Sequence, residues 1–256
     1  MLRRDVRRLL VTGRVQGVGF RPFVARTATA LGVDGWVRND GAGVTIVVAG
    51  LPSILDRFER LVRETVPLPG RIDAMTRLAD GPTPLPGFVI AESATGGPRT
   101  QECAPDFAPC PECLAELAGS GRRAGYAHIA CSACGPRHAV TAELPFDRAR
   151  TSMARFALCA DCAREYADPA DRRHHAQLIS CPACGPRLAF ATLDGPVLAD
   201  GPEALDACVA ALRDGAIVAV KGVGGFLLVC DATRADVVLA LRARKQRPMK
   251  PLAVLV

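Results

Sequence analysis

Gly13-Arg14-Val15-Gln16-Gly17-Val18-Gly19-Phe20-Arg21-Pro22 decides the fold of the first part of the chain. An apolar strand pattern precedes this stretch, and a helical pattern starts at Pro22. Three glycines let several backbone N–H groups converge, and the start of a helix adds a partial positive charge. Arg21 can donate two hydrogen bonds to phosphate oxygens. The stretch therefore predicts a phosphate cradle, with an ordinary glycine-rich turn as the alternative.

The residues around this loop alternate between strand and helix patterns. Apolar spacing predicts strands at 6–12, 35–39, 44–49, 72–78 and 88–91, and helices at 22–31 and 52–66. The order βαββαβ predicts an α+β, ferredoxin-like sandwich of four strands with two helices on one face. Asn39 ends the second strand, where its side chain could hold a water for in-line attack.

The cradle and the segment Gly35–Gly43 (GWVRNDGAG) closely resemble acylphosphatase, over about residues 5–92. This resemblance implies an acylphosphatase sandwich in which Arg21 binds the acyl phosphate and Asn39 orients the nucleophilic water. It also implies that catalysis is positioning and charge stabilisation without a covalent intermediate. The phosphate loop would consist of Val15, Gln16, Gly17, Val18, Gly19 and Phe20.

Nine of the 11 cysteines lie in residues 103–184, and eight of them form two copies of one pattern, Cys-x2-Cys followed by Cys-x2-Cys-Gly-Pro-Arg. Such a repeat implies two copies of one small unit. Four thiolates in two pairs match a structural, tetrahedral Zn2+ site, so we predict two zinc ions. Disulfides are a less favoured alternative, because no export signal is evident and cytosolic thiols stay reduced. An iron–sulfur cluster is the other alternative, and the ribbon-like spacing favours zinc over it. The predicted ligands are Cys110, Cys113, Cys131 and Cys134 in one copy, and Cys159, Cys162, Cys181 and Cys184 in the other.

A few chemically active residues fit no pattern. Cys103, Cys208 and Cys230 have no partner spacing and are predicted to be buried free thiols. His175 follows another histidine, but four cysteines already satisfy each predicted zinc. The sequence leaves open whether His175 is a surface or supporting residue or a functional one.

The last part of the chain alternates helix and strand again. We predict helices at 203–213 and 235–244, and strands at 216–220, 226–230 and 252–256. All three lysines of the chain lie here, near glycines and prolines. Lys245, Arg247 and Lys250 predict a phosphate-binding site, with a solvated basic helix end as the alternative. The stretch resembles the start of the YrdC-like α/β domain, which implies that these three residues handle nucleotide phosphates.

The predicted domains are an acylphosphatase-like domain at 1–95, a tandem zinc-finger region at 103–190 and an incomplete YrdC-like domain at 200–256. Their order, with Pro145–Arg148 and Asp171–Gln177, resembles the carbamoyltransferase family of [NiFe]-hydrogenase maturation. The resemblance implies hydrolysis of carbamoyl phosphate, ATP as co-substrate, and carbamoyl transfer to a cysteine of the partner protein HypE. It also implies that this chain is a fragment that keeps the hydrolytic and finger parts.

Composition narrows the remaining choices. The chain is 49% hydrophobic and 23% charged, which is typical of a folded globular protein. No apolar run reaches the length of a membrane span and no secretory signal is evident, so a cytoplasmic protein is expected. Two alternative functions remain: a stand-alone acylphosphatase, and a zinc-ribbon nucleic-acid-binding protein with a non-catalytic acylphosphatase-like domain. Aromatic residues make up only 5% of the chain, so stacking platforms for nucleic acid are scarce.

Overall fold

The computed structural model describes residues 4–79, 81–94 and 100–255, so the predicted domain limits at 1, 95 and 256 lie outside the described residues. The chain forms two compact units. The first runs to residue 185, apart from residues 125–127, which belong with residues 186–256 in the second. Each unit is described by itself. Among the described residues, no helix combines the length and the apolar character needed to cross a membrane.

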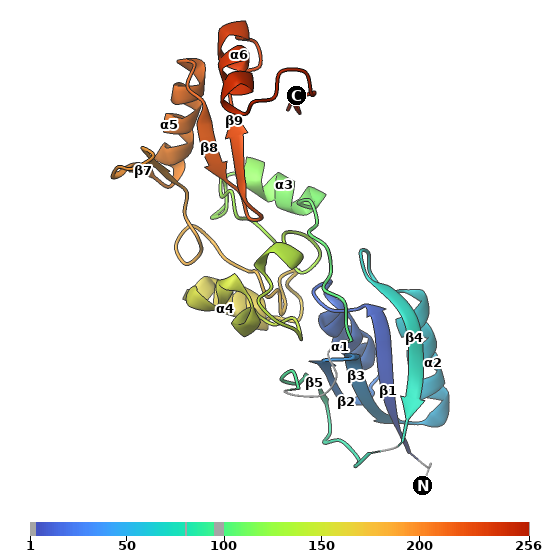
Figure 1. Cartoon of the computed structure of the whole chain (residues 1–256). Coiled ribbons are helices and arrows are strands. Elements are labelled where there is room, and N and C mark those ends of the chain that lie inside the picture. Colours follow the sequence, from blue (N-terminus) through green and yellow to red (C-terminus); the bar gives the residue numbers. More distant parts are fainter. Residues whose placement is uncertain (1–3, 80, 95–99, 256) are drawn as a thin grey trace. The chain divides into compact units, whose positions relative to one another are not determined.

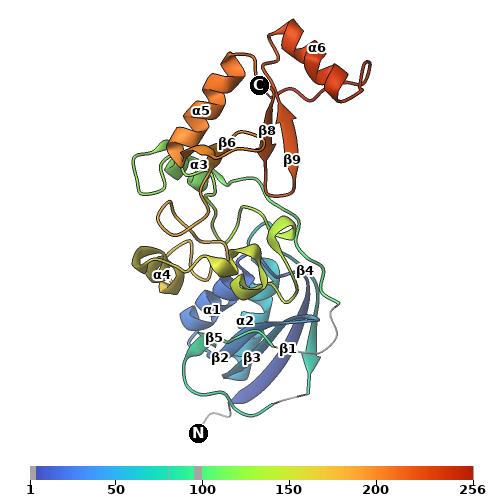
Figure 2. The same cartoon turned by 60° about the vertical axis from the view of Figure 1, so that its left-hand side comes forward.

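The first unit begins with a five-stranded sheet in the order β4-β1-β3-β2-β5 (Figure 1). All neighbours are antiparallel except β2 and β5, which pair in parallel. Two helices, α1 and α2, cover one face of this sheet (Figure 2). The elements are β1 (Asp5–Arg14), α1 (Phe20–Ala30), β2 (Asp34–Asp40), β3 (Gly43–Gly50), α2 (Pro52–Glu64), β4 (Arg71–Leu78) and β5 (Phe88–Ile90).

The core between sheet and helices follows from the apolar spacing. Val11 of β1 and Ile46 of β3 are fully buried against Val24 of α1 and Phe58 of α2. The helix α2 buries Leu55, Phe58 and Val62, which share one face at helical spacing. The sandwich is thus confirmed. The strand predicted at 88–91 forms as β5 at the edge, so the sheet has five strands where the predicted sandwich has four. In the part of the chain that the structure describes, β2 is the one strand with which β5 pairs.

The finger region contains little regular structure. It has two short helices, α3 (Pro111–Ala118) and α4 (Ala160–Ala167), and 3-10 turns at His138–Val140, Arg148–Arg150 and Ser152–Arg155. Each helix begins directly after the first cysteine of its repeat, which places the second cysteine in the first helical turn. The remaining backbone follows loops, because small zinc units rely on metal bonds more than on an apolar core.

The second unit holds the hairpins β6 (Ala189–Ala191) with β7 (Val197–Asp200), and β8 (Val218–Lys221) with β9 (Phe226–Val229). Two helices, α5 (Pro202–Arg213) and α6 (Ala235–Arg244), accompany them. The predicted strand at 252–256 was wrong for its described part, since residues 251–255 have no regular structure. A strand needs a neighbour for its backbone hydrogen bonds, and no described strand pairs with this segment.

Candidate functional site

The glycine-rich loop between β1 and α1 forms a tight cradle. Gly17 and Gly19 have φ angles of 72° and 73°, in the left-handed region that favours glycine. A Cβ atom on Gly17 would lie 3.0 Å from Cδ of Arg137, and one on Gly19 would lie 3.3 Å from the Ser132 side chain. The cradle is therefore shaped by its own backbone and closed by residues of the first finger.

Arg21 and Asn39 lie together at this cradle, as the sequence predicts. Both are buried, and both line one pocket with the loop. Nη2 of Arg21 is 2.8 Å from Oδ1 of Asp147, and Nδ2 of Asn39 donates to the Phe146 carbonyl at 2.9 Å. Oδ1 of Asn39 is buried and has no hydrogen-bond partner within the described part of the chain. An acceptor left free in a polar pocket is suited to hold a water.

The finger region supplies the other wall of the pocket. The Phe146 amide donates to Oε1 of Gln16 at 2.9 Å, while Nε2 of Gln16 donates to the Gly43 carbonyl at 2.6 Å. The Arg137 side chain donates to the Gly17 carbonyl. Burial lowers the pKa of Arg137 to about 10, so the guanidinium keeps its charge at neutral pH. The finger residues lining the pocket are Ser132, Arg137, Phe146, His175, Ala176 and Gln177.

The eight predicted zinc ligands form two clusters, in each of which all sulfur atoms lie within 4.8 Å of one another. In the first cluster, Sγ of Cys134 is 3.5 Å from Cys113 and 3.6 Å from Cys131. In the second, Sγ of Cys184 is 3.6 Å from Cys162 and 3.7 Å from Cys181. A tetrahedron with Zn–S bonds of about 2.3 Å has edges of about 3.8 Å. The two clusters thus fit two structural zinc sites, with none of these cysteines in a disulfide.

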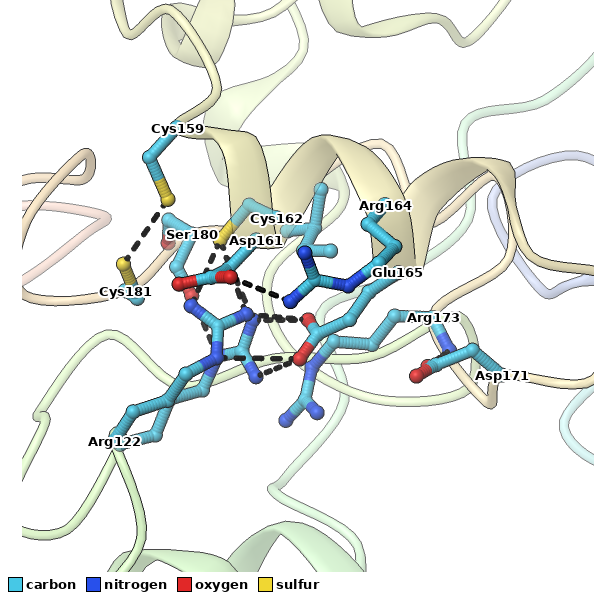
Figure 3. A network of polar contacts seen from close by, with 12 residues as sticks. Arg122, Cys159, Asp161, Cys162, Arg164, Glu165, Asp171, Arg173, Ser180 and Cys181 are labelled. Carbon is cyan, nitrogen blue, oxygen red and sulfur yellow. Dashed lines mark hydrogen bonds and ion pairs between the residues drawn. The ribbon is translucent and has the colours of Figure 1, made fainter.

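Arginines of the first finger reach the cysteine cluster of the second. Nη1 and Nη2 of Arg122 both lie 3.4 Å from Sγ of Cys162. Arg122 and Arg123 both pair with Glu165 of α4, at 2.7 and 2.6 Å, as Figure 3 shows for Arg122. Nε of Arg123 also donates to the Ser180 carbonyl at 2.8 Å.

Arginines of the second finger return these contacts. Nη1 of Arg172 lies 3.0 Å from Sγ of Cys113, and both Arg172 and Arg173 pair with Glu116 of α3. Nε of Arg173 donates to the Ala130 carbonyl at 3.1 Å. The two fingers therefore exchange an arginine pair. Four thiolates around Zn2+ leave a site with excess negative charge, and each finger supplies cations to its neighbour.

Two carboxylates at the centre of this exchange are held ionised. Burial alone would raise the pKa of Glu165, but hydrogen bonds from Arg123 and Arg122 lower it to about 2. Burial acts in the same way on Glu116, and Arg173 leads the hydrogen bonds that lower its pKa. Buried arginine charges are thereby compensated within the finger region.

The predicted nucleotide residues belong to the second unit, on one mostly exposed stretch after α6. Lys245 and Lys250 are exposed, and Arg247 is half-buried. Arg242 was not singled out from the sequence, yet its Nη1 donates to the carbonyls of Arg247, Pro248 and Lys250 at 3.2, 3.2 and 2.9 Å. Arg242 therefore holds the backbone of residues 247–250, which carries two of the predicted phosphate ligands, in a turn around its guanidinium group.

The three cysteines without a pattern are half-buried free thiols, where burial was predicted. Sγ of Cys103 lies 3.4 Å from the Thr141 hydroxyl. Sequence reasoning also missed the Phe146 carbonyl, because a backbone group leaves no side-chain signal. It also missed the ion pairs between the glutamates of one finger and the arginines of the other, although the repeat itself carries a signal for them. Glu116 and Glu165, like the Arg122–Arg123 and Arg172–Arg173 pairs, recur at the offset of the cysteine repeat.

Three families match successive parts of the chain. Acylphosphatase matches residues 7–90, and the HypF finger matches residues 110–141 and 158–191. A family described as telomere recombination (Sua5, YciO and YrdC) matches residues 210–256. The matches follow the order of the elements described above.

Relatives of known name cover nearly the whole chain. It is 51% identical over 248 residues to carbamoyltransferase HypF of Rhodobacter capsulatus, covering 97% of this chain and 33% of that protein. Carbamoyltransferase HypF2 of Cupriavidus necator is 48% identical over 252 residues, 97% of this chain and 31% of that protein. The crystal structure of full-length HypF in a phosphate- and nucleotide-bound form superposes with a TM-score of 0.87 at 36% identity. That superposition covers 98% of this chain and 33% of the other, so this chain spans about a third of its relatives' length.

Proposed function

We propose, from the premise that this chain belongs to the HypF family of carbamoyltransferases, that its anion cradle hydrolyses carbamoyl phosphate. The observation that carries the proposal is the pairing of Arg21 with Asn39 at the cradle. Arg21 offers a buried cation, and Asn39 offers a buried acceptor oxygen that has no partner among the described residues. An anionic phosphate needs the former, and an attacking water needs the latter.

The reaction follows from these positions. Backbone N–H groups of the loop and the Arg21 guanidinium hold the phosphoryl oxygens, replacing the Asp147 carboxylate at Arg21. Oδ1 of Asn39 accepts a hydrogen bond from water, whose oxygen forms a bond to phosphorus. The bond between phosphorus and the acyl oxygen breaks, giving carbamate and phosphate, and the water proton leaves to solvent. The residues act by position and charge, without a covalent intermediate.

The orientation of Asn39 supports this role. A side-chain amide can present either its oxygen or its nitrogen to a pocket. Here the Phe146 carbonyl accepts from Nδ2 at 2.9 Å, which leaves Oδ1 as the acceptor for water. The two cysteine clusters would hold zinc as a structural ion, and its bonds would stabilise the finger region that carries Phe146.

The longer reaction belongs to the same proposal. In the whole protein, carbamate would react with ATP to form carbamoyl-adenylate, with Lys245, Arg247 and Lys250 at the nucleotide phosphates. The carbamoyl group would then pass to a cysteine thiol of a HypE partner, in the cytoplasm. The nucleic-acid alternative receives less support, because the finger arginines Arg122, Arg123, Arg172 and Arg173 pair with carboxylates and contact cysteine sulfurs.

The test measures phosphate release from carbamoyl phosphate by the zinc-loaded chain, above the rate without protein. Arg21→Ala and Asn39→Ala should each lower kcat/KM at least about 100-fold. Arg77→Ala is the matched control, since Arg77 is an exposed arginine of the same sheet that pairs with Glu59 outside the pocket. Wild-type rates in Arg21→Ala, or no release above background in the intact chain, would overturn the proposal.

A further inference from the structure

The pocket at the cradle has two chemically different walls. The loop wall and Arg21 offer hydrogen-bond donors, which suit the phosphoryl oxygens of a substrate. The finger wall carries the one imidazole among the lining residues, that of His175. Neither the cradle nor the zinc clusters account for this residue.

The backbone holds His175 in an unusual conformation. Its φ angle is 52°, which is uncommon for a residue other than glycine. Two hydrogen bonds fix it there: its N–H donates to the Tyr166 carbonyl at 2.9 Å, and its carbonyl accepts from Nε2 of Gln177 at 2.6 Å. The surrounding structure thus maintains a costly backbone geometry at a residue that lines the pocket.

The ring itself is fixed by its neighbours. Its centroid is 4.9 Å from that of Tyr166 and 4.7 Å from that of His174, which meets it edge-on. Yet no described residue makes a hydrogen bond with either imidazole nitrogen of His175. Burial, with the charges of His174 and Arg21, lowers the pKa of His175 to about 4. At neutral pH the ring is uncharged, and one of its nitrogens is an acceptor.

We propose that His175 determines the acyl-group specificity of this site by accepting a hydrogen bond from the NH2 group of a carbamoyl phosphate. This inference rests on the proposed hydrolysis and adds the recognition of the acyl group. Acetyl phosphate has a methyl group in place of NH2, so it would leave the imidazole acceptor unpaired. A site built to pair with a polar group rejects the analogue that lacks it. His175 is thus a specificity-determining residue and does not touch the reacting phosphorus.

The experiment compares kcat/KM for carbamoyl phosphate and acetyl phosphate in the zinc-loaded chain. The wild type should prefer carbamoyl phosphate, and His175→Ala should reduce this preference at least about tenfold while acetyl phosphate hydrolysis changes little. His175→Gln keeps an acceptor oxygen and should retain part of the preference. His138→Ala is the matched control, because His138 is an exposed histidine of the same finger region.

The outcomes separate the two proposals. If the wild type hydrolyses neither substrate, the proposed function fails. If it hydrolyses both and His175→Ala leaves their ratio unchanged, or lowers both rates equally with wild-type zinc content, the specificity role is overturned while the hydrolysis stands. A fall in the ratio that His175→Gln partly restores supports the specificity role.

Discussion

The two zinc-finger units have nearly the same cysteine pattern but different surroundings. Arg137 of the first Cys-Gly-Pro-Arg motif is 2% exposed and reaches the Gly17 carbonyl of the cradle. Its counterpart Arg187 has a side chain that is 61% exposed and lies 3.5 Å from Asp200 within the second unit. One motif therefore builds the same cysteine cluster twice, while the fold around each copy decides whether its arginine also contacts the cradle.

The contacts between the two fingers, in contrast, are the same for both copies, because each finger makes them to the other. Arg122 reaches Cys162 and Arg172 reaches Cys113, while Glu165 and Glu116 accept the ion pairs. This shared part should respond equally when either copy is changed. The part that differs should respond only in the first copy.

The largest effect should come from removing one zinc ligand from either copy. Cys131→Ser and Cys181→Ser should both lower hydrolysis of carbamoyl phosphate about 100-fold, because each unfolded finger withdraws the arginines that its neighbour needs and displaces the pocket wall. The zinc content of each variant shows whether the metal is lost, and phosphate release measures the fall in hydrolysis. Wild-type hydrolysis in Cys181→Ser would contradict the reciprocity, and Cys208→Ser serves as the control thiol outside both clusters.

The next largest effect should distinguish the two copies. Arg137→Ala should lower kcat/KM roughly 10- to 100-fold, since the Gly17 carbonyl and several finger carbonyls lose their donor. Arg187→Ala should change kcat/KM less than about twofold, because its ion pair is exposed. Equal losses in the two variants would show that the motif arginine acts through the zinc cluster alone.

A smaller, symmetric effect is expected from the central carboxylates. Glu116→Gln and Glu165→Gln should each lower the free energy of unfolding by about 1–3 kcal/mol, since each leaves nearly buried guanidinium groups without a full counter-charge. Urea unfolding at constant zinc measures it. A loss confined to one variant would mean that the exchange is structural on one side only.

The smallest effect concerns pH. The pKa of His175 is lowered to about 4, so below its ordinary pKa of 6.5 the unfolded chain takes up a proton that the folded chain does not. Stability should therefore fall as the pH drops from about 7 to about 4. Solvent screening limits this contribution to less than about 1 kcal/mol. His175→Gln should show a shallower pH dependence of the unfolding free energy, and identical slopes would contradict the low pKa.

The sequence predicted the local features of the molecule well. The cradle, the sandwich and the two cysteine clusters follow from spacing, because each depends on residues whose chemistry is visible in the chain. Arg21 and Asn39 were expected together for the same reason. Two features were harder to predict from the sequence: the pairing of β5 with β2, and the absence of a strand at 251–255. Strand formation depends on a neighbouring strand, which the local pattern does not identify.

The wall of the pocket could not be predicted in this way. Phe146 acts through its backbone and Asp147 through a contact more than a hundred residues from Arg21, so neither has a local signature. His175 stood out in the sequence, but only the fold brings it to the pocket at the cradle. Contacts between residues far apart in the chain are the feature that is hardest to predict from a single sequence.

The position of Phe146 in the chain also orders events during synthesis. The strands and helices around the cradle leave the ribosome well before the finger segment that orients Asn39. The second wall of the pocket can therefore form only after the finger residues that line it, Ser132 to Gln177, have been synthesised. Under the proposed function, zinc supply to the growing chain would then decide when the hydrolytic site is complete.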